Sequence, residues 1–333
     1  MTEKCVTYTD DLSDPGMYKL VSHIMTCIEV PVHIYGAWCI LFKTSPTMKS
    51  VKGLLLWSHF LSALLDITVS FMTIPYVLFP SFAIYTFGVL DYPKVLVIVG
   101  LIFCALAVTS ILSIYENRYY VLFAKDKNIL WCKIRKYFLS LNYFLAVTFV
   151  IPLVLAIPDQ AYGLQRVTET LGCTPEPYID GHAVFVVAVD FKPTIACLAF
   201  ESVSLTVEIL AFLFTIFAKL SLQDKTKTAS NRTRQFQKRF VIAICLQTLV
   251  PVALLMSPVF YVLTTVLLNY RNQTLINLCF LIGSSHGVLS TIVMVFIHQP
   301  YRDATFDLGC FLIGKRGRRR TKTSGPHSSV VRI

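Results

Sequence analysis

Long apolar stretches, separated by short polar segments, dominate the chain from end to end. A helix needs roughly 20 apolar residues to cross the hydrocarbon core of a bilayer. Seven stretches reach about that length, at residues 18–42, 53–79, 95–118, 137–157, 194–220, 240–268 and 275–297. Because no ten-residue strands of alternating polarity occur, the pattern predicts helices and not a membrane barrel. We expect an all-α membrane protein built as a bundle of seven transmembrane helices.

The pattern divides the chain into an N-terminal tail of residues 1–17, a membrane domain of residues 18–297 and a C-terminal tail of residues 298–333. The N-terminal tail is polar and lacks the basic start of a cleavable signal peptide, so we expect the first helix to insert the chain. In the C-terminal tail, Phe306, Cys310 and Ile313 recur at helical spacing. This spacing favours a short helix at the membrane surface, where Cys310 could be palmitoylated and the following basic residues could bind anionic lipids. The alternative is a solvated basic tail.

Composition and charge agree with a membrane protein. Hydrophobic residues make up 55% of the 333 positions and charged residues only 15%, whereas a soluble domain has about 25% charged residues. The 30 Lys and Arg residues are unevenly placed, because 24 lie in one set of alternating segments and 6 in the other. Cytoplasmic loops are enriched in Lys and Arg, so we expect the N-terminus outside and the C-terminus in the cytoplasm. Since the basic residues are spread over four separate segments, we exclude nucleic acid as a partner.

The third predicted helix ends in Glu116, Asn117, Arg118 and Tyr119. Seven helices with an outer N-terminus are the layout of G-protein-coupled receptors, although layout alone does not establish function. Rhodopsin-like receptors carry an acidic-Arg-aromatic switch at this place, and the same residue types occur here with Asn117 inserted. The alternative is an ordinary helix end whose long side chains reach water. Residues two apart do not face each other on a helix, so the pairing of Glu116 with Arg118 stays open.

Acidic residues and a histidine interrupt the apolar stretches. Placing an ionisable side chain inside a membrane costs free energy, so each such residue is a candidate for a functional role. Asp66 lies in the middle of the second predicted helix, where rhodopsin-like receptors have the aspartate of their Na⁺ site. Glu29 and His33 lie one turn apart in the first, and Glu201 and Glu208 share one face of the fifth. We expect these residues to make interior polar contacts or to form an ion or ligand site.

Prolines and cysteines add two further expectations. Pro251 and Pro258 remove backbone hydrogen bonds from the sixth predicted helix and predict a bend in it. Of the ten cysteines, Cys5 and Cys173 fall on the expected outer, oxidising side, so a disulfide there most simply joins these two. The sequence leaves open whether the bond forms, because it does not give the distance between them.

The longest outer connection covers residues 158–193 and contains "AVFVVAVDF". This segment favours either an extended stretch that covers the bundle or a solvated loop. No nucleotide-binding, metalloprotease or serine-hydrolase motif occurs, and the histidines lack metal-ligand spacing. We therefore expect a protein that is not an enzyme and that uses no cofactor or metal.

Several motifs occur in a fixed order: "VPVHIYGAWCILFKTSPTMKSVK", "SHFLSALLDITVSF", "YENRYY", "PDQ" and "GSSHGVLSTIVMVFIHQPYR". Together they resemble the class H serpentine receptors of nematodes, over most of the chain from about Glu29 to Arg302. The resemblance implies a chemoreceptor of the plasma membrane, expected in sensory cilia, that binds a chemical ligand and couples to a heterotrimeric G protein. The outer halves of the predicted helices are mainly apolar, which favours a small, largely apolar ligand. At residues 298–301 the chain has "HQPY" where rhodopsin-like receptors have Asn-Pro-x-x-Tyr.

Two other classes of membrane protein stay open. A ligand-gated cation channel of the kind found among insect chemoreceptors would have the opposite topology, against which the distribution of Lys and Arg argues. A transporter would show paired repeats and helices broken at matching positions, and the sequence contains neither.

The orientation can be tested with epitope tags at the two termini. A tag at the N-terminus should be stained on intact cells, and a tag at the C-terminus only after permeabilisation, because the Lys-rich and Arg-rich segments are retained in the cytoplasm. An N-terminal tag that is stained only in permeabilised cells would contradict the orientation and favour the channel class.

Overall fold

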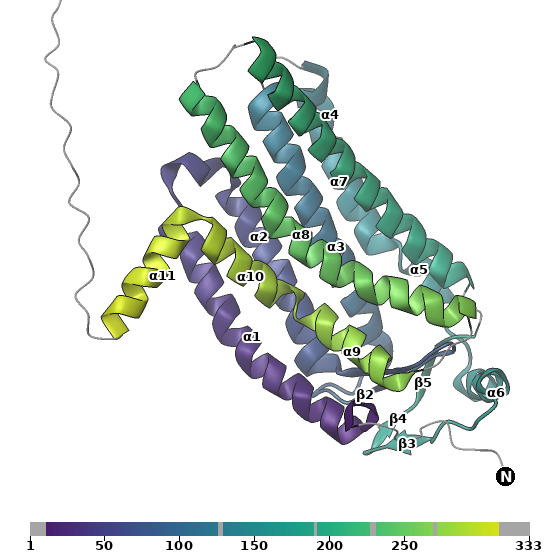
Figure 1. Ribbon diagram of the computed structural model, residues 1–333. Coiled ribbons are helices and arrows are strands. Elements are labelled where there is room, and N and C mark those ends of the chain that lie inside the picture. The colour runs from purple at the N-terminus through teal and green to yellow at the C-terminus, as the bar shows by residue number, and fades with distance from the viewer. Residues whose placement is uncertain (1–10, 126–128, 190–191, 227–230, 269–271, 313–333) are drawn as a thin grey trace, which may run out of the picture.

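The computed structural model describes residues 11–125, 129–189, 192–226, 231–268 and 272–312. Most of them form long helices that run side by side as a bundle (Figure 1). Five described helical stretches are long and apolar enough to cross a membrane, and a bent pair of shorter helices makes six if the pair is one span. The described residues thus form a multi-pass helical membrane protein. The seventh crossing stays a prediction at residues 240–268, where a long helix lies that is only partly described.

The bundle contains α1 (Pro15–Lys43), α2 (Lys49–Ile67), α3 (Pro93–Tyr119), α4 (Ile129–Thr148), α7 (Lys192–Thr226), α8 (Asn231–Leu268), α9 (Gln273–Ser284) and α10 (His286–Ile297). Shorter helical pieces are η1 (Asp11–Ser13), η2 (Pro46–Met48), α5 (Ile151–Leu155), α6 (Gln160–Leu171) and α11 (Gln299–Leu312), and the π-turns η3 (Thr68–Thr73) and η4 (Tyr120–Ala124) extend α2 and α3. The strands are β1 (Pro75–Leu78), β2 (Phe82–Thr86), β3 (Tyr178–Ile179), β4 (His182–Ala183) and β5 (Phe185–Ala188). We call the end where α1 begins the N-terminal end of the bundle, and the end where α1 stops the C-terminal end.

Helix α3 lies at the centre of the bundle and packs against α2, α4 and α7. Every residue from 109 to 118 is buried. A helix that is buried on all sides must be surrounded by other elements, so the last turns of α3 contact several helices at once.

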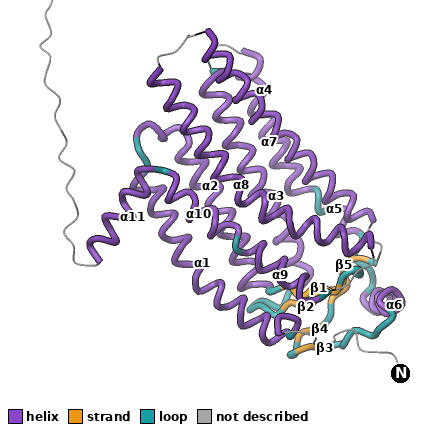
Figure 2. Tube along the Cα trace, in the orientation of Figure 1, coloured by secondary structure: helices purple, strands orange, loops and turns teal. Residues whose placement is uncertain are grey.

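A small antiparallel sheet of β1, β2 and β5 lies at the N-terminal end, close to α6 (Figure 2). Our prediction of a helix that continues to residue 79 is wrong from Ile74 onwards. Ile74 has a left-handed φ of 40° and precedes Pro75, which has no N–H to continue the helix. The apolar run 75–78 instead forms β1, which pairs with β2 from Pro75 opposite Thr86. Of the two alternatives for "AVFVVAVDF", the structure has the extended one at Phe185–Ala188, which form β5 and pair with β2.

The "PDQ" motif fixes the connection between α4 and the sheet. Asp159 caps α6 by accepting hydrogen bonds from the backbone N–H groups of Ala161 and Tyr162. Gln160 binds β5 as a neighbouring strand would: its Nε2 donates to Val186 O at 3.1 Å, and Val186 N donates to its Oε1 at 2.8 Å. These bonds tie the start of α6 to β5, so that the two ends of the connection at residues 158–193 lie together.

The described part of the C-terminal tail forms α11, as the spacing of its apolar residues predicts. Two hydrogen bonds join this helix to α1: Tyr35 with Thr305 at 2.7 Å and Thr44 with Tyr301 at 2.8 Å. Phe306 is 60% exposed, and Ile313 lies outside the described residues. Contact of α11 with the membrane surface, and palmitoylation of Cys310, remain predictions.

Candidate functional site

A cavity of about 330 Å³ lies between the helices in the N-terminal half of the bundle. Its walls come from α2, α3, α7, α8 and α9, and from β1 and β2. Most lining side chains are apolar, such as Val77, Phe82, Leu101, Val108 and Val262. Mainly apolar cavities of a few hundred Å³ bind small molecules. The cavity is therefore the first candidate for a ligand site.

A few polar side chains interrupt the apolar wall: Thr68, Thr73, Cys104, Glu201, Ser202 and Cys279. Among the described residues that line the cavity, Glu201 alone carries a carboxyl group. It comes from α7 and is only 6% exposed. Glu208, two turns further along α7, does not line the cavity. The two acids that share one face of the predicted helix thus lie in different surroundings.

A second polar site, centred on Asp66, joins α1, α2 and α10. Asp66 is completely buried, and both of its oxygens contact N–H donors. His33 Nε2 lies 3.1 Å from Oδ2, and His286 Nδ1 lies 2.6 Å from Oδ1. The backbone N–H of Gly287 donates to Oδ1 at 3.4 Å, and that of Val288 donates to Oδ2 at 3.2 Å. We call this set of contacts the Asp66 junction.

The break between α9 and α10 creates the junction. The two helices are bent by 40° at Ser285, so that α10 begins inside the bundle with its first backbone N–H groups directed at Asp66. A helix N-terminus stabilises a carboxylate through these N–H groups and the helix dipole. A side chain at Gly287 would meet the Asp66 carboxylate and the His33 ring. Only glycine at position 287 therefore lets the start of α10 approach Asp66 this closely.

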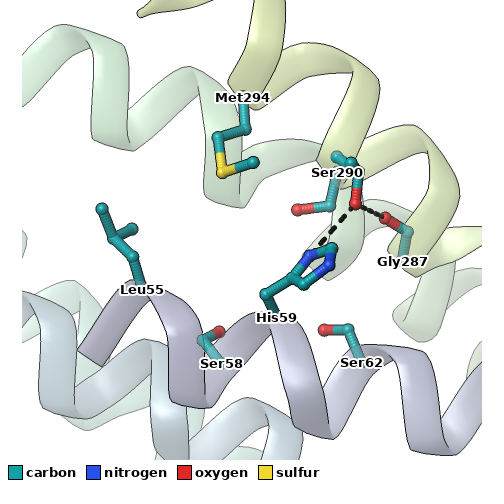
Figure 3. A pocket seen from close by; sticks show the side chains of 8 residues that line it. Leu55, Ser58, His59, Ser62, Gly287, Ser290 and Met294 are labelled. Carbon is teal, nitrogen blue, oxygen red and sulfur yellow. Dashed lines mark hydrogen bonds between the residues drawn. The ribbon is translucent and has the colours of Figure 1, made fainter. Parts of the chain in front are cut away.

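A small polar cavity of about 20 Å³ adjoins the junction between α2 and α10, where Figure 3 shows His59 directed at the facing helix. His59 Nε2 lies 2.9 Å from His33 O, and its Nδ1 lies 3.3 Å from Thr291 Oγ1. Ser58, Ser62 and Ser290 complete the polar wall. The space and its polar partners suit about one water molecule.

Glu29 lies at the N-terminal side of this junction. It is fully buried and accepts a hydrogen bond from Ser70 in η3. Ser70 in turn binds Thr26 at 3.0 Å, which ties α1 to the end of α2. The three predicted polar residues Glu29, His33 and Asp66 therefore belong to one layer between α1 and α2.

At the C-terminal end, Glu116 pairs with Arg135 of α4. Arg135 makes two bonds to the carboxylate, Nε to Oε1 at 2.9 Å and Nη2 to Oε2 at 2.7 Å. Trp131 Nε1 donates a third bond to Oε1 at 2.9 Å. Glu116 is completely buried and Arg135 is 22% exposed. A bidentate, buried pair of this kind is stronger than an exposed ion pair.

The next two residues of the motif reach other elements. Asn117 Nδ2 lies 3.5 Å from Ser50 O at the start of α2. Arg118 is 6% exposed and lies close enough to His298, at the end of α10, for their charges to interact. The motif thus reaches α2 as well as α4, and Arg118 lies near the end of α10.

Tyr119 completes the set through α7. Lys219 Nζ lies 3.3 Å from its hydroxyl and 4.8 Å from the centre of its ring, a cation–π contact. Its ring also packs against Trp131 and Phe212. Successive residues on a helix point about 100° apart, so the four consecutive residues of this central helix are directed at different neighbouring elements.

Sequence reasoning missed several partners. In the sequence His286 and His59 are two of several scattered histidines, and Arg135 is one of many charges in a basic segment. A signal for Arg135 is present, because Trp131 and Arg135 are four residues apart and therefore share a helix face. Pro258 lines the cavity, and the bend predicted at Pro251 and Pro258 remains a prediction.

Of the two cysteines predicted to form a disulfide, the structure describes one. Cys173 is buried and disulfide-bonded. Cys5 lies outside the described residues, so the pairing of these two cysteines stays a prediction. Among the described residues, no group of three or more His, Cys, Asp or Glu side chains is arranged as a metal site.

The chain is similar to known proteins over most of its length. The chain is 27% identical over 287 residues to the serpentine receptor class H-72 of Caenorhabditis elegans, and the match covers 84% of this chain and 81% of the relative. The family model described as "Serpentine type 7TM GPCR chemoreceptor Srh" matches residues 13–311. That match includes the residues of the cavity, the Asp66 junction, and Glu116 with its partners Arg135 and Trp131. The chain therefore belongs to the Srh family of serpentine seven-transmembrane chemoreceptors.

Proposed function

We propose that this chemoreceptor binds a small, largely apolar molecule from outside the cell and signals to a heterotrimeric G protein. The observation that carries the proposal is the apolar cavity of about 330 Å³ in the N-terminal half of the bundle. Membership of the Srh family supports a receptor and not an enzyme.

The proposed orientation gives each end of the bundle its role. If the segments rich in Lys and Arg face the cytoplasm, the cavity lies in the outer half of the plasma membrane, where a chemical ligand enters. The C-terminal end, with Glu116, Arg118 and α11, then faces the G protein. A sensory cilium is the expected location of such a receptor.

The Glu116–Arg135 pair is the proposed restraint of the resting state. It joins α3 to α4, while Arg118 lies beside the end of α10. A receptor switch needs a contact that differs between two states. We propose that the pair opens on activation and that Arg118 then contacts the G protein or the inner ends of α7 and α8.

The proposed function predicts that filling the cavity abolishes the response. A screen of volatile and water-soluble compounds on cells that express the receptor and a calcium reporter first supplies an agonist. A Cβ at Gly283 would meet only Pro258, at 3.9 Å, and both residues line the cavity. Gly283→Leu should therefore raise the half-maximal agonist concentration by about tenfold or more, equivalent to about 1.4 kcal/mol.

The matched control is Gly53→Leu, at an exposed position of α2 with no atom near its Cβ. It should leave the half-maximal concentration within about twofold, since a lipid-facing change does not alter the cavity. An agonist that activates the Gly283→Leu receptor normally, at equal surface expression, would contradict the proposal that the cavity is the ligand site.

The proposed restraint predicts signalling without a ligand. Glu116→Gln and Arg135→Gln should each raise basal G-protein activation by about fivefold or more, because each opens the same contact between α3 and α4. The double variant should do no more than either single one. Arg118→Ala should abolish signalling and leave surface expression intact.

The exposed pair of Arg166 and Glu169 on α6 provides the control, because its loss should not affect the C-terminal end. Basal activity is measured with a G-protein activation assay and divided by the amount of tagged receptor at the surface. If the Arg118→Ala receptor reaches the surface and signals normally, the proposed role of the motif in activation is wrong, and its side chains only hold the end of α3 in place.

A further inference from the structure

We propose that the ligand of this receptor is an amine, an apolar skeleton with one protonated nitrogen that pairs with Glu201. The inference rests on the proposed function and deepens it, because it names the chemical class that the cavity takes. Three observations about Glu201 support the inference. Its side chain lines the cavity, the described residues supply it with no hydrogen-bond donor, and a second acid, Glu208, lies on the same helix.

Glu201 lies where a ligand must meet it. It is 6% exposed and lines the cavity from α7, as Cys104 of α3 and Cys279 of α9 line it from other helices. The other polar lining groups among the described residues are hydroxyls and thiols, which are neutral. Among the described lining residues, a positively charged group of a ligand therefore has one carboxyl group to pair with, that of Glu201.

Other buried carboxylates in the bundle have donors from the protein. Asp66 contacts two imidazoles and two backbone N–H groups. Glu116 contacts Arg135 and Trp131, and Glu29 accepts a bond from Ser70. For Glu201, by contrast, the described residues supply no hydrogen-bond donor and no positively charged neighbour.

The charge near Glu201 increases the need for a cation. Glu208 on the same helix adds a like charge, and no lining residue in the described part of the chain is Lys, Arg or His. An acid buried in an apolar membrane interior without a partner is costly. A protonated amine removes this cost with a charge-assisted hydrogen bond, whereas an alcohol offers only a neutral one. A carboxylic acid would be repelled by both glutamates.

The test uses matched sets of amine, alcohol and carboxylic acid on one skeleton, for example 2-phenylethylamine, 2-phenylethanol and phenylacetic acid, and hexylamine, hexan-1-ol and hexanoic acid. Skeletons of about six to twelve non-hydrogen atoms suit a site of this size. Binding is measured as the rise in unfolding temperature of the purified full-length receptor with each compound. The amine of a set should bind at least about tenfold more tightly than its alcohol, and the acid should bind more weakly than both.

Glu201→Gln should remove the preference for the amine and leave binding of the alcohol within about twofold. Glu201→Asp keeps the carboxylate and should retain the preference for the amine over the alcohol. This result would show that the loss of preference in Glu201→Gln does not come from misfolding. Glu208→Gln removes an acid from the same helix outside the cavity. It should keep the preference for the amine, although in weaker form, because the neighbouring like charge is lost and the carboxylate in the cavity remains.

The outcomes separate this inference from the proposed function. If neutral compounds bind as tightly as the amines, or if Glu201→Gln keeps the preference, the amine inference is wrong while the cavity remains the ligand site. The amine inference is also wrong if no amine of the series binds. If Gly283→Leu also leaves the binding of every compound unchanged, the cavity is not the ligand site and the proposed function fails with it.

Discussion

A buried carboxylate that must be satisfied inside the membrane determines how three helices meet. Asp66 is completely buried, and its two oxygens lie within 3.4 Å of ring nitrogens of His33 on α1 and His286 on α10 and of the backbone N–H groups of Gly287 and Val288. An isolated charge at this depth would cost several kcal/mol. The requirement explains why α9 and α10 are separate helices: an unbroken helix would keep these backbone N–H groups for its own hydrogen bonds. It also explains the glycine at 287, where a larger residue would meet the carboxylate.

The junction separates two regions with different chemistry. Towards the N-terminal end lies the apolar cavity, covered by β1 and β2 and lined by α3 and α7. Towards the C-terminal end, α3 finishes in Glu116, Asn117 and Tyr119, which contact α4, α2 and α7, and in Arg118, which lies near the end of α10. Because α3 contributes to both regions and is buried between them, a shift of this helix at the cavity would change the contacts of Glu116 under the proposed function. This is a physical route by which a ligand in one half could alter the surface of the other.

Much of this architecture could be read from the sequence, and the failures have specific causes. The lengths of the apolar runs predict the helices, and the cost of burial identifies Asp66, Glu29 and His33 as interior groups. The partner His286 could not be found because it lies 220 positions from Asp66 in the chain, and only the fold brings them together. Arg135 falls in a predicted basic loop, whereas α4 begins at Ile129, eight residues before the predicted start at 137. The strand β1 could not be predicted because it lies within a long apolar run, and composition does not distinguish a short buried strand from the end of a helix.

The most direct test of this arrangement is a double-mutant cycle on the contact between Asp66 and His286. Unfolding temperatures of the purified receptor are measured for Asp66→Asn, His286→Asn and the double variant. If the contact holds α2 to α10, both single changes lower the stability, and the double change adds little, which gives a coupling energy of about 1 kcal/mol or more. Losses that simply add, with a coupling energy near zero, would contradict the claim that this junction holds the bundle together.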